Sequence, residues 1–437
     1  MSIRPEHGWL IFAGEILAGH LVEHTPMSCS LIYEESWIQK GYALSPYLPL
    51  TGEFSDGDVS RFLRNLIPEG YGLATLLSSQ HESRLNTCSL LKYIAIESAG
   101  SLRFVCNGLP EVKQQELTIE MLSSRLKNDS NIVVWNRQFR LQVAGVQKKV
   151  NVHIRENDSM WLATEDAIST HIIKVRGDSS RNDIINEWFC MMLAKAIGLE
   201  VAEVSLLEIN DEPALLVTRF DREPSYARKI RRHHIIDGCQ ALNLPPDYKY
   251  EQPFGRGPDV SSIRDGASLK ALFNFAKVCQ HPSLAQTELL KWVAFNLVIG
   301  NGDAHAKNIS FFVNEEGITP APLYDLLSTV LLGEEDPNLD INLSMAIGDE
   351  FDINNITAFH LLSFAEECDI APNKLKGTLQ QIALDCKKVS SIELCNGENL
   401  KPEALTTLSK LTTLINQRAD HFLNECELFV EIHHSLF

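Results

Sequence analysis

The pattern of hydrophobic and polar positions changes twice along the chain, and each change predicts a different kind of structure. Up to residue 130, short apolar runs such as residues 8–13 accompany a helical pattern over residues 60–78 and many Gly and Pro breakers. Residues 131–220 carry short runs of apolar and β-branched residues between polar or Gly turns, which is typical of strands. After Phe220, apolar residues recur every three or four positions, which predicts helices. The predicted fold class is therefore α+β.

The middle region is predicted to be a lobe of strands with one helix. The helix has Asp183 at the N-cap position, apolar residues at helical spacing, and Gly198 as its stop. The order of strand, Gly loop, two strands of which the second carries a basic residue, helix and two strands is that of a nucleotide-binding lobe. The predicted strands cover residues 139–144, 149–154, 170–175, 201–209 and 214–220.

The last region is predicted to be all-α except for one hairpin. Two short strands, residues 309–313 and 318–323, flank a turn at residues 314–317. A hairpin embedded in a helical region indicates a functional site. The predicted helices cover residues 268–279, 284–298, 356–367, 372–386 and 402–429.

The length of 437 residues, with 44% hydrophobic residues, corresponds to two or three domains with real cores. It excludes disorder, collagen and coiled coil for the whole chain. We therefore expect an N-terminal α+β subdomain over residues 1–130, a β-rich nucleotide-binding lobe over residues 131–220 and an all-α lobe over residues 221–437.

Charge and cysteine content narrow the class of protein further. The 39 Lys and Arg against 57 Asp and Glu give a net charge of −18, and an acidic surface repels DNA and anionic lipid. The ten cysteines contain no C-x-x-C pair, so we expect reduced, mostly buried thiols. The apolar stretch at residues 292–299 is much shorter than the ~20 residues of a membrane span. A cytoplasmic protein without a membrane partner is expected.

The densest cluster of chemically active residues lies between a predicted helix and the hairpin, at residues 301–308. Asp303 and Asn308 have the D-x-x-x-x-N spacing of a protein-kinase catalytic loop. In that loop the Asp accepts the proton of an acceptor hydroxyl, and the Asn supplies an oxygen to Mg²⁺. Asp325, 22 positions after Asp303, stands where a kinase has its second metal ligand, although Leu326 follows it in place of Phe. Each residue alone is more often a cap or turn residue, and the ordered combination predicts a kinase.

The phosphate end of the predicted site lies in the strand lobe. Gly145, in the turn at residues 143–149, allows backbone N–H groups to approach phosphate oxygens, although a plain hairpin turn explains one glycine equally well. Lys174 ends an apolar strand, where a kinase places the lysine that binds the α- and β-phosphates. A solvated strand edge is the alternative for Lys174. Glu187 in the next helix is a candidate ion-pair partner for Lys174, or part of a solvated helix face.

Two further signals carry less weight. His305 has no second His at zinc-ligand spacing, so a zinc site is not predicted. A basic run at residues 228–232, followed by His233 and His234, would suit nucleic acid or an acidic partner, but a solvated loop of mixed charge is the preferred interpretation. No G-x-S-x-G or Walker A sequence occurs in the chain.

These residues resemble a known family. Residues 301–310 and 321–328 are similar to the signature of the HipA family of bacterial Ser/Thr kinases, the toxins of HipBA toxin–antitoxin modules. The similarity to the family extends to the predicted strand lobe and to the N-terminal region before residue 131, so it spans nearly the whole chain. The further matching segments are residues 65–70, 143–149, 170–174, 216–222 and 239–242.

The resemblance implies a protein-kinase-like two-lobe architecture, with a mixed α/β N-terminal lobe, an all-α C-terminal lobe and ATP·Mg²⁺ between them. It implies that Asp303 is the catalytic base, that Asn308 and Asp325 are the Mg²⁺ ligands, and that Lys174 binds phosphate. The implied phosphate loop comprises Ala144, Gly145, Val146, Gln147, Lys148 and Lys149. The implied adenine strand comprises Thr218, Arg219 and Phe220, and the remaining pocket comprises His305, Ala306, Lys307 and Tyr324.

The resemblance also implies a biological role. Family members phosphorylate a serine of an aminoacyl-tRNA synthetase, typically glutamyl-tRNA synthetase, which inhibits translation and causes growth arrest or persistence. A small helix-turn-helix antitoxin, HipB-like, neutralises them and binds operator DNA, so DNA contact is expected only through that partner.

One departure from the family and two alternative functions stay open at this point. Gln142 stands where autoregulated members carry a phosphorylatable Ser, and an amide cannot accept phosphate, so self-inactivation there is in doubt. One alternative function is a kinase-shaped co-repressor that binds the antitoxin on DNA. The other is a small-molecule or lipid kinase with the same loop spacing.

Overall fold

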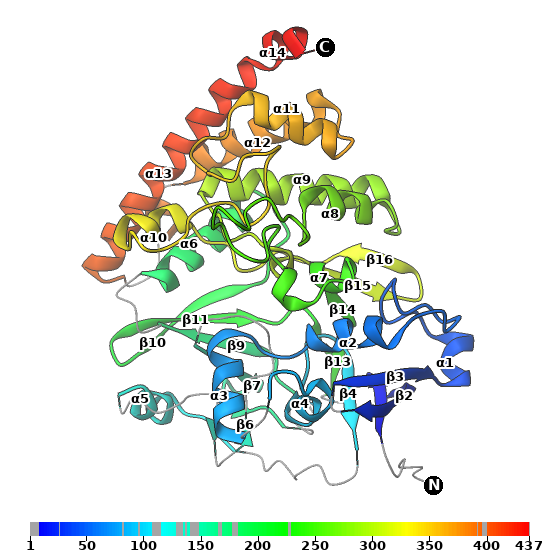
Figure 1. Cartoon of the computed structure of the whole chain (residues 1–437). Helices are drawn as coiled ribbons and strands as arrows, with labels where there is room; N and C mark the ends of the chain where they lie inside the picture. The colour runs from blue at the N-terminus through cyan, green and yellow to red at the C-terminus, as the bar shows by residue number, and fades with distance from the viewer. Residues whose placement is uncertain are drawn as a thin grey trace. The chain divides into compact units, whose positions relative to one another are not determined.

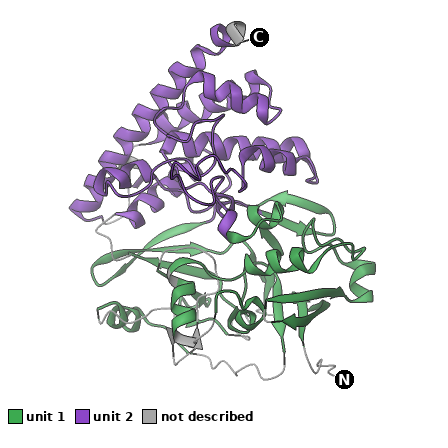
Figure 2. Cartoon of the chain, in the orientation of Figure 1, with its two compact units in different colours: residues 1–177, 203–246, 311–321 green, residues 178–202, 247–310, 322–437 purple. Residues whose placement is uncertain are grey.

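The chain folds into two compact units, each assembled from separate stretches of sequence (Figure 2). The first unit comprises residues 1–177, 203–246 and 311–321, and the second comprises residues 178–202, 247–310 and 322–437. The structure is a computed structural model. It describes residues 8–25, 27–80, 83–94, 97–106, 115–127, 134–135, 138–139, 148–164, 168–176, 182–225, 229–390, 392–395 and 400–436.

The first sheet of unit 1 is antiparallel, with strand order β3-β2-β1-β4 (Figure 1). Buried and less buried residues alternate along β3 and β4, whereas four of the five residues of β1 are buried, and helices supply further apolar residues to the core. The predicted helix over residues 60–78 is divided in two, because Asn65 ends the first helix and Pro68 follows it. The elements are β1 (Trp9–Ala13), β2 (Ile16–Thr25), β3 (Ser28–Tyr33), α1 (Glu35–Lys40), α2 (Asp56–Arg64), α3 (Gly70–Gln80), α4 (Thr87–Ile94), β4 (Leu102–Val105) and α5 (Ile119–Lys127).

The second sheet of unit 1 has the order β10-β11-β9-β7-β8 and contains four of the five strands predicted for the nucleotide lobe. The fifth predicted strand, residues 139–144, lies outside the described residues except for Phe139. The predicted strands at 149–154 and 170–175 are confirmed. The strand predicted at 201–209 begins three residues later, at residue 204, and the strand predicted at 214–220 lies two residues earlier, at 212–218. Its strands are β7 (Lys149–Ile154), β8 (Met160–Leu162), β9 (His171–Val175), β10 (Val204–Ile209) and β11 (Glu212–Thr218). A separate short pair is formed by β5 (Val134–Trp135) and β6 (Gln138–Phe139).

The expectation that residues after Phe220 are helical apart from one hairpin is wrong for residues 222–225 and 229–237. They form β12 (Arg222–Ser225), β13 (Lys229–Arg232) and β14 (Ile235–Asp237), and a short helix, α7 (Gly238–Ala241), follows. The predicted hairpin is confirmed as β15 (Ser310–Asn314) and β16 (Gly317–Pro320), and β14 pairs with it. Residues 229–232 of the basic run form strand β13 rather than a solvated loop, and the Arg232 guanidinium lies 4.0 Å from the carboxylate of the buried Glu97.

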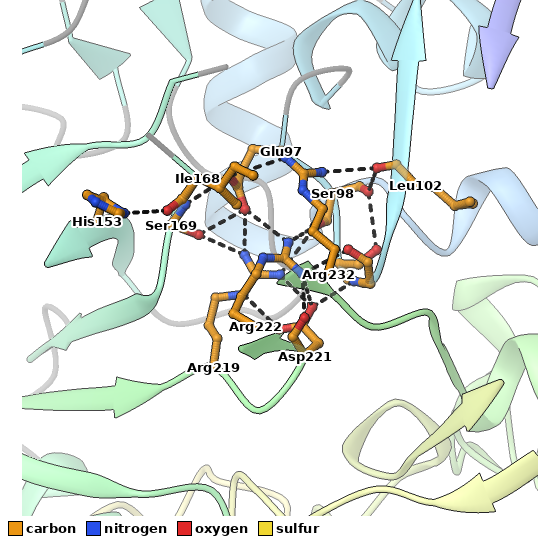
Figure 3. A network of polar contacts seen from close by, with 12 residues as sticks. Glu97, Ser98, Leu102, His153, Ile168, Ser169, Arg219, Asp221, Arg222 and Arg232 are labelled. Carbon is orange, nitrogen blue, oxygen red and sulfur yellow. Dashed lines mark hydrogen bonds and ion pairs between the residues drawn. The ribbon is translucent and has the colours of Figure 1, made fainter. Parts of the chain in front are cut away.

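A buried ion network in unit 1 joins the segment between α4 and β4 to residues 219–222 and to β13 (Figure 3). Glu97, between α4 and β4, accepts hydrogen bonds from Arg219 at 2.9 Å and Arg222 at 3.1 Å. Asp221 accepts hydrogen bonds from the same two guanidiniums at 2.7 Å, and Arg232 lies 4.0 Å from Glu97. Burial would raise the pKa of Glu97, but the charges of these three arginines hold it below its ordinary value.

Unit 2 is built from helices around α9, which packs against α12 and α13. The largest side chains of its core include Trp188 and Trp292, both fully buried. The predicted helices are confirmed, although the last one is divided at Leu428. The helices of unit 2 are α6 (Asp183–Ala196), α8 (Leu269–Ala276), α9 (Pro282–Ile299), α10 (Thr329–Glu335), α11 (Ala358–Glu367), α12 (Pro372–Val389), α13 (Pro402–Glu427) and α14 (Phe429–Leu436). Of these, α10 was not predicted from the sequence. The N-cap of α6 is Asn182 rather than Asp183.

The cysteines and the apolar helices are the next features that the sequence analysis predicted. All ten cysteines are free thiols, and nine of them are buried, as expected. In the part of the chain that the structure describes, no helix has the length and apolarity needed to cross a bilayer.

The buried imidazole of His234, in unit 1, predicts that the stability of the folded protein falls in acid. Its Nε2 donates a hydrogen bond to the Leu44 carbonyl at 2.8 Å, and burial lowers the pKa of the imidazole to about 4. The pKa of this histidine in the unfolded chain is ~6.5. Between pH 4 and this value, the imidazole binds a proton in the unfolded chain and stays neutral in the folded chain. The stabilising contribution is therefore present above pH ~6.5 and is lost as the pH falls toward 4.

We expect the free energy of unfolding to fall less between pH 7 and pH 5 in His234→Gln than in the unchanged protein. Urea unfolding at both pH values measures this difference. His281→Gln, which alters an exposed imidazole, is the control and should keep the original pH dependence. Identical pH dependence in all three proteins would contradict the assignment to His234.

Candidate active site

The predicted catalytic loop begins where α9 ends. Gly300 has a φ of 73°, the left-handed conformation that terminates helices at glycine. The backbone N–H of Asn301 then donates to the Asn296 carbonyl at 2.8 Å, and their side-chain amides hydrogen-bond at 2.8 Å. The loop therefore leaves the helix in a fixed direction.

Gly302 is enclosed on all sides, which explains the absence of a side chain. A Cβ atom at this position would lie 2.1 Å from the Ile341 carbonyl oxygen. Its N–H donates to Thr329 Oγ1 at 2.7 Å, and its carbonyl accepts from both the N–H and the hydroxyl of Ser344. Thr329 and residues 341–344 thus fix the position of Gly302, immediately before Asp303.

Asp303 and Asn308 form one closed loop, as their spacing predicts. The N–H of Asp303 donates to Asn301 Oδ1 at 3.1 Å, and its carbonyl accepts from Asn308 Nδ2 at 2.9 Å and from the His305 N–H at 2.8 Å. The carboxylate of Asp303 is exposed. Because Nδ2 is the donor in the Asn308 bond, Oδ1 is the amide atom that can face a cation. A proton acceptor and a hard oxygen donor are therefore held on one short turn.

A tyrosine that the sequence did not indicate contacts this loop. The hydroxyl of Tyr250 donates a hydrogen bond to Asp303 Oδ1 at 3.1 Å. Tyr250 lies 53 positions before Asp303, so no local motif signals it. Its ring also packs edge-on against His305, with ring centroids 5.3 Å apart.

The segment that carries Tyr324 and Asp325 is fixed on both sides. Leu323, just before it, exchanges backbone hydrogen bonds with residues 200 and 202, each at 2.8 Å. The Tyr324 hydroxyl donates to the Lys307 carbonyl at 2.7 Å and lies 2.8 Å from Ser310 Oγ. Asp325 has a φ of 59°, a left-handed conformation that is uncommon without glycine and often occurs at functional sites.

The residues after Asp325 are anchored by a buried amide. Asn186 of α6 donates to the Ser328 carbonyl and accepts from the Ser328 N–H, both at 2.8 Å. Asn186 is fully buried, so losing this pair of bonds would leave unsatisfied polar groups in the core. Within unit 2, four predicted residues, Asp303, Asn308, Tyr324 and Asp325, therefore lie on loops with fixed ends.

The predicted phosphate lysines share one face of the second sheet of unit 1. Lys149 on β7 pairs directly with Lys174 on β9. Both side chains are less than a tenth exposed. Residues that are directly opposed on neighbouring strands point to the same face of the sheet, so the two ammonium groups lie on one face. This cross-strand pair is an arrangement suited to phosphate.

In the predicted adenine strand, the side chain of Arg219 belongs to the buried ion network. Its guanidinium is fully buried and bonded to Glu97, Asp221 and Ser169 (Figure 3). A contact of Arg219 with adenine would have to use its backbone, because its guanidinium is engaged in the core. Thr218 ends β11. Phe220 lines a cavity of about 1010 Å³ in unit 1 together with Phe312.

Several predicted residues are not tested by these contacts. Gln142 and the phosphate-loop residues Ala144, Gly145, Val146 and Gln147 lie outside the described residues, and Lys148 precedes β7. Glu187 is buried on α6 in unit 2, whereas Lys174 belongs to unit 1, so their pairing stays a prediction. His305, Ala306 and Lys307 are buried in the turn between Asp303 and Asn308.

Comparison with known proteins adds to this geometry. The model of the HipA-like C-terminal domain matches residues 141–389, and the model of the HipA N-terminal domain matches residues 9–105. This chain belongs to the HipA family. The "Serine/threonine-protein kinase toxin HipA" of Shewanella oneidensis is 38% identical over 377 residues, 85% of either chain. The "Putative kinase Y4mE" of Sinorhizobium fredii is 29% identical over 389 residues, which are 85% of this chain and 87% of that protein.

A solved structure resembles this HipA chain over almost its full length. It is the complex of Shewanella oneidensis HipA, HipB and operator DNA, with a TM-score of 0.87, 34% identity, and coverage of 97% of this chain and 99% of that one. The α+β, kinase-like two-lobe fold expected from the sequence is confirmed. The chain is an enzyme of the serine/threonine-protein kinase class and a homologue of the HipA toxin.

Proposed function

We propose that this HipA homologue transfers the γ-phosphate of Mg·ATP to serine residues of a protein and acts as the toxin of a toxin–antitoxin pair. The observation that carries the proposal is the closed loop in which Asn308 Nδ2 hydrogen-bonds the Asp303 carbonyl at 2.9 Å. This hydrogen bond holds Asp303 and Asn308 on one turn, which supports their proposed roles as proton acceptor and metal ligand in phosphoryl transfer.

Lys149 and Lys174 are proposed to bind the phosphates of ATP, with Lys148 and residues 144–147 completing the phosphate loop. Their direct cross-strand pairing supports this assignment. Thr218, Arg219 and Phe220 are proposed to meet adenine through the backbone, and His305, Ala306, Lys307 and Tyr324 to complete the pocket.

Asp303 is the proposed base. Its exposed carboxylate accepts the proton of the acceptor serine hydroxyl as the oxygen of that hydroxyl attacks phosphorus. The Asn308 amide oxygen and the Asp325 carboxylate are hard oxygen donors, the kind that Mg²⁺ prefers, and are the proposed metal ligands. When bound, Mg²⁺ neutralises charge on the phosphates and so stabilises the transition state.

The proposed acceptor is an aminoacyl-tRNA synthetase, such as glutamyl-tRNA synthetase, whose phosphorylation would inhibit translation and cause growth arrest and persistence. This choice rests on the family to which the chain belongs. The proposed partner is a HipB-like helix-turn-helix antitoxin, supported by the presence of HipB and operator DNA in the similar Shewanella complex. A net charge of −18 makes DNA contact through a partner more favourable than direct contact.

Controlled expression followed by phosphopeptide mass spectrometry tests the proposal. We expect growth arrest and new phosphoserine peptides, including one from an aminoacyl-tRNA synthetase. Asp325→Asn, which removes a proposed metal ligand, should produce neither. New phosphopeptides at equal levels in both strains would contradict the proposed function, and a set without any synthetase would contradict only the proposed acceptor.

A second function, co-repression through the antitoxin, is favoured by the same Shewanella complex on DNA. A reporter behind the operator should lose repression when this chain is deleted. If Asp325→Asn restores repression, the co-repressor function is independent of catalysis.

A further inference from the structure

Tyr250 is placed at the proposed catalytic base by contacts of its neighbours as well as its own. The Lys249 carbonyl accepts a hydrogen bond from the Ala306 N–H at 3.2 Å, and the Glu251 N–H donates to the Ser344 carbonyl at 2.9 Å. The residues on both sides of Tyr250 are therefore tied to the catalytic loop and to the segment that encloses Gly302.

The side chain of Tyr250 is held independently of its hydroxyl. Its ring packs edge-on against His305 at an interplanar angle of 80°, and Lys249 Nζ lies 5.2 Å from the ring centroid. These contacts orient the phenol, and its hydroxyl reaches Asp303 Oδ1 at 3.1 Å. The Tyr250 hydroxyl is therefore already oriented as a donor to the Asp303 carboxylate.

An exposed aspartate carboxylate needs such a donor to keep one orientation. The terminal torsion of Asp is broad and roughly two-fold, so the carboxylate of Asp303 has no strong preference of its own. The backbone bonds of Asp303 fix its Cα but not this torsion. A hydrogen bond to Oδ1 leaves Oδ2 as the oxygen that meets the acceptor hydroxyl, and productive proton transfer requires that geometry.

We propose that Tyr250 is a positioning residue, whose hydroxyl fixes the Asp303 carboxylate with Oδ2 directed to the acceptor serine. The proposal rests on Asp303 acting as the base. Tyr250 itself gives up no proton to the substrate and forms no bond with phosphorus.

Tyr250→Phe isolates this role, because it removes the hydroxyl and keeps the ring against His305. We expect kcat to fall about 10-fold or more, the size of effect that one hydrogen bond to a charged group produces, while the KM for ATP changes less than about 2-fold. Initial rates of phosphate transfer from Mg·ATP to dephosphorylated casein and to glutamyl-tRNA synthetase provide both constants. Thermal unfolding should be unchanged within ~2 °C, because the hydrogen bond is exposed.

Tyr248→Phe is the matched control. Tyr248 lies two positions away and packs against Phe254, with ring centroids 5.8 Å apart. It should keep kcat within about 2-fold. A kcat for Tyr250→Phe equal to that of Tyr248→Phe would overturn the proposal.

A double variant separates positioning from a general effect on the loop. If Tyr250 acts through the Asp303 carboxylate, its removal should cost less than about 2-fold in an Asp303→Asn background. A full 10-fold loss there would overturn the proposal while leaving the kinase function intact. A wild-type chain that transfers no phosphate under any condition would instead contradict the proposed function, and the role of Tyr250 with it.

Discussion

Asp303→Asn is expected to lower kcat for phosphate transfer by about 10²- to 10⁴-fold, the range that general-base catalysis contributes. The amide has nearly the same shape as the carboxylate but cannot take the proton of an acceptor hydroxyl. The bonds that shape the loop use the backbone N–H and carbonyl of Asp303, which this variant keeps. Binding of Mg·ATP should therefore stay within about 2-fold, because Asn308 and Asp325 remain.

Steady-state transfer rates and calorimetric titration with Mg·ATP measure the two quantities separately. Asp259→Asn makes the same chemical change on an exposed residue of unit 2, outside the catalytic loop, and should leave both unchanged. If Asp303→Asn transferred phosphate as fast as Asp259→Asn, Asp303 would not be the base. If it lost nucleotide binding as well, the loop would have a structural rather than a chemical role.

The parts of the fold that the sequence predicted are those whose pattern is local and strong. Most of α9 and α12 follows from apolar spacing over residues 284–298 and 372–386, and the β15–β16 hairpin follows from two apolar runs around a Gly turn. β13 was missed because its basic run predicted a solvated loop. Glu97, the carboxylate that both Arg222 and Arg232 approach, lies more than 120 positions before each of them.

The candidate site divides in the same way. Asp303 and Asn308 were found because their chemistry depends on a fixed spacing within one loop. Tyr250 was missed because it reaches Asp303 from a distant segment. Arg219 was assigned to adenine from a motif, and only its burial and ion pairs show that its side chain belongs to the core of unit 1.

Glu97→Gln is expected to be the most destabilising single change in unit 1, at about 3–5 kcal/mol, the cost of breaking a buried ion pair by removing one partner. In the folded protein, Glu97 and Asp221 face three guanidiniums, those of Arg219, Arg222 and Arg232. Removing the Glu97 charge leaves Asp221 as the single carboxylate of this network. Because all five side chains are at most 5% exposed, water cannot replace the lost charge.

Urea unfolding at pH 7 measures this loss, with Glu212→Gln as the matched control. Glu212 also pairs with an arginine, Arg176 at 3.1 Å, but its side chain is 55% exposed, so its removal should cost no more than about 1 kcal/mol. The pH dependence adds a second criterion. The pKa of Glu97 is lowered in the folded protein, so its contribution is present above the unfolded pKa of ~4.3 and disappears as the pH falls below it. The difference between Glu97→Gln and the unchanged protein should therefore shrink in acid, and a difference that stays constant would mean that the charge of Glu97 is not what stabilises unit 1.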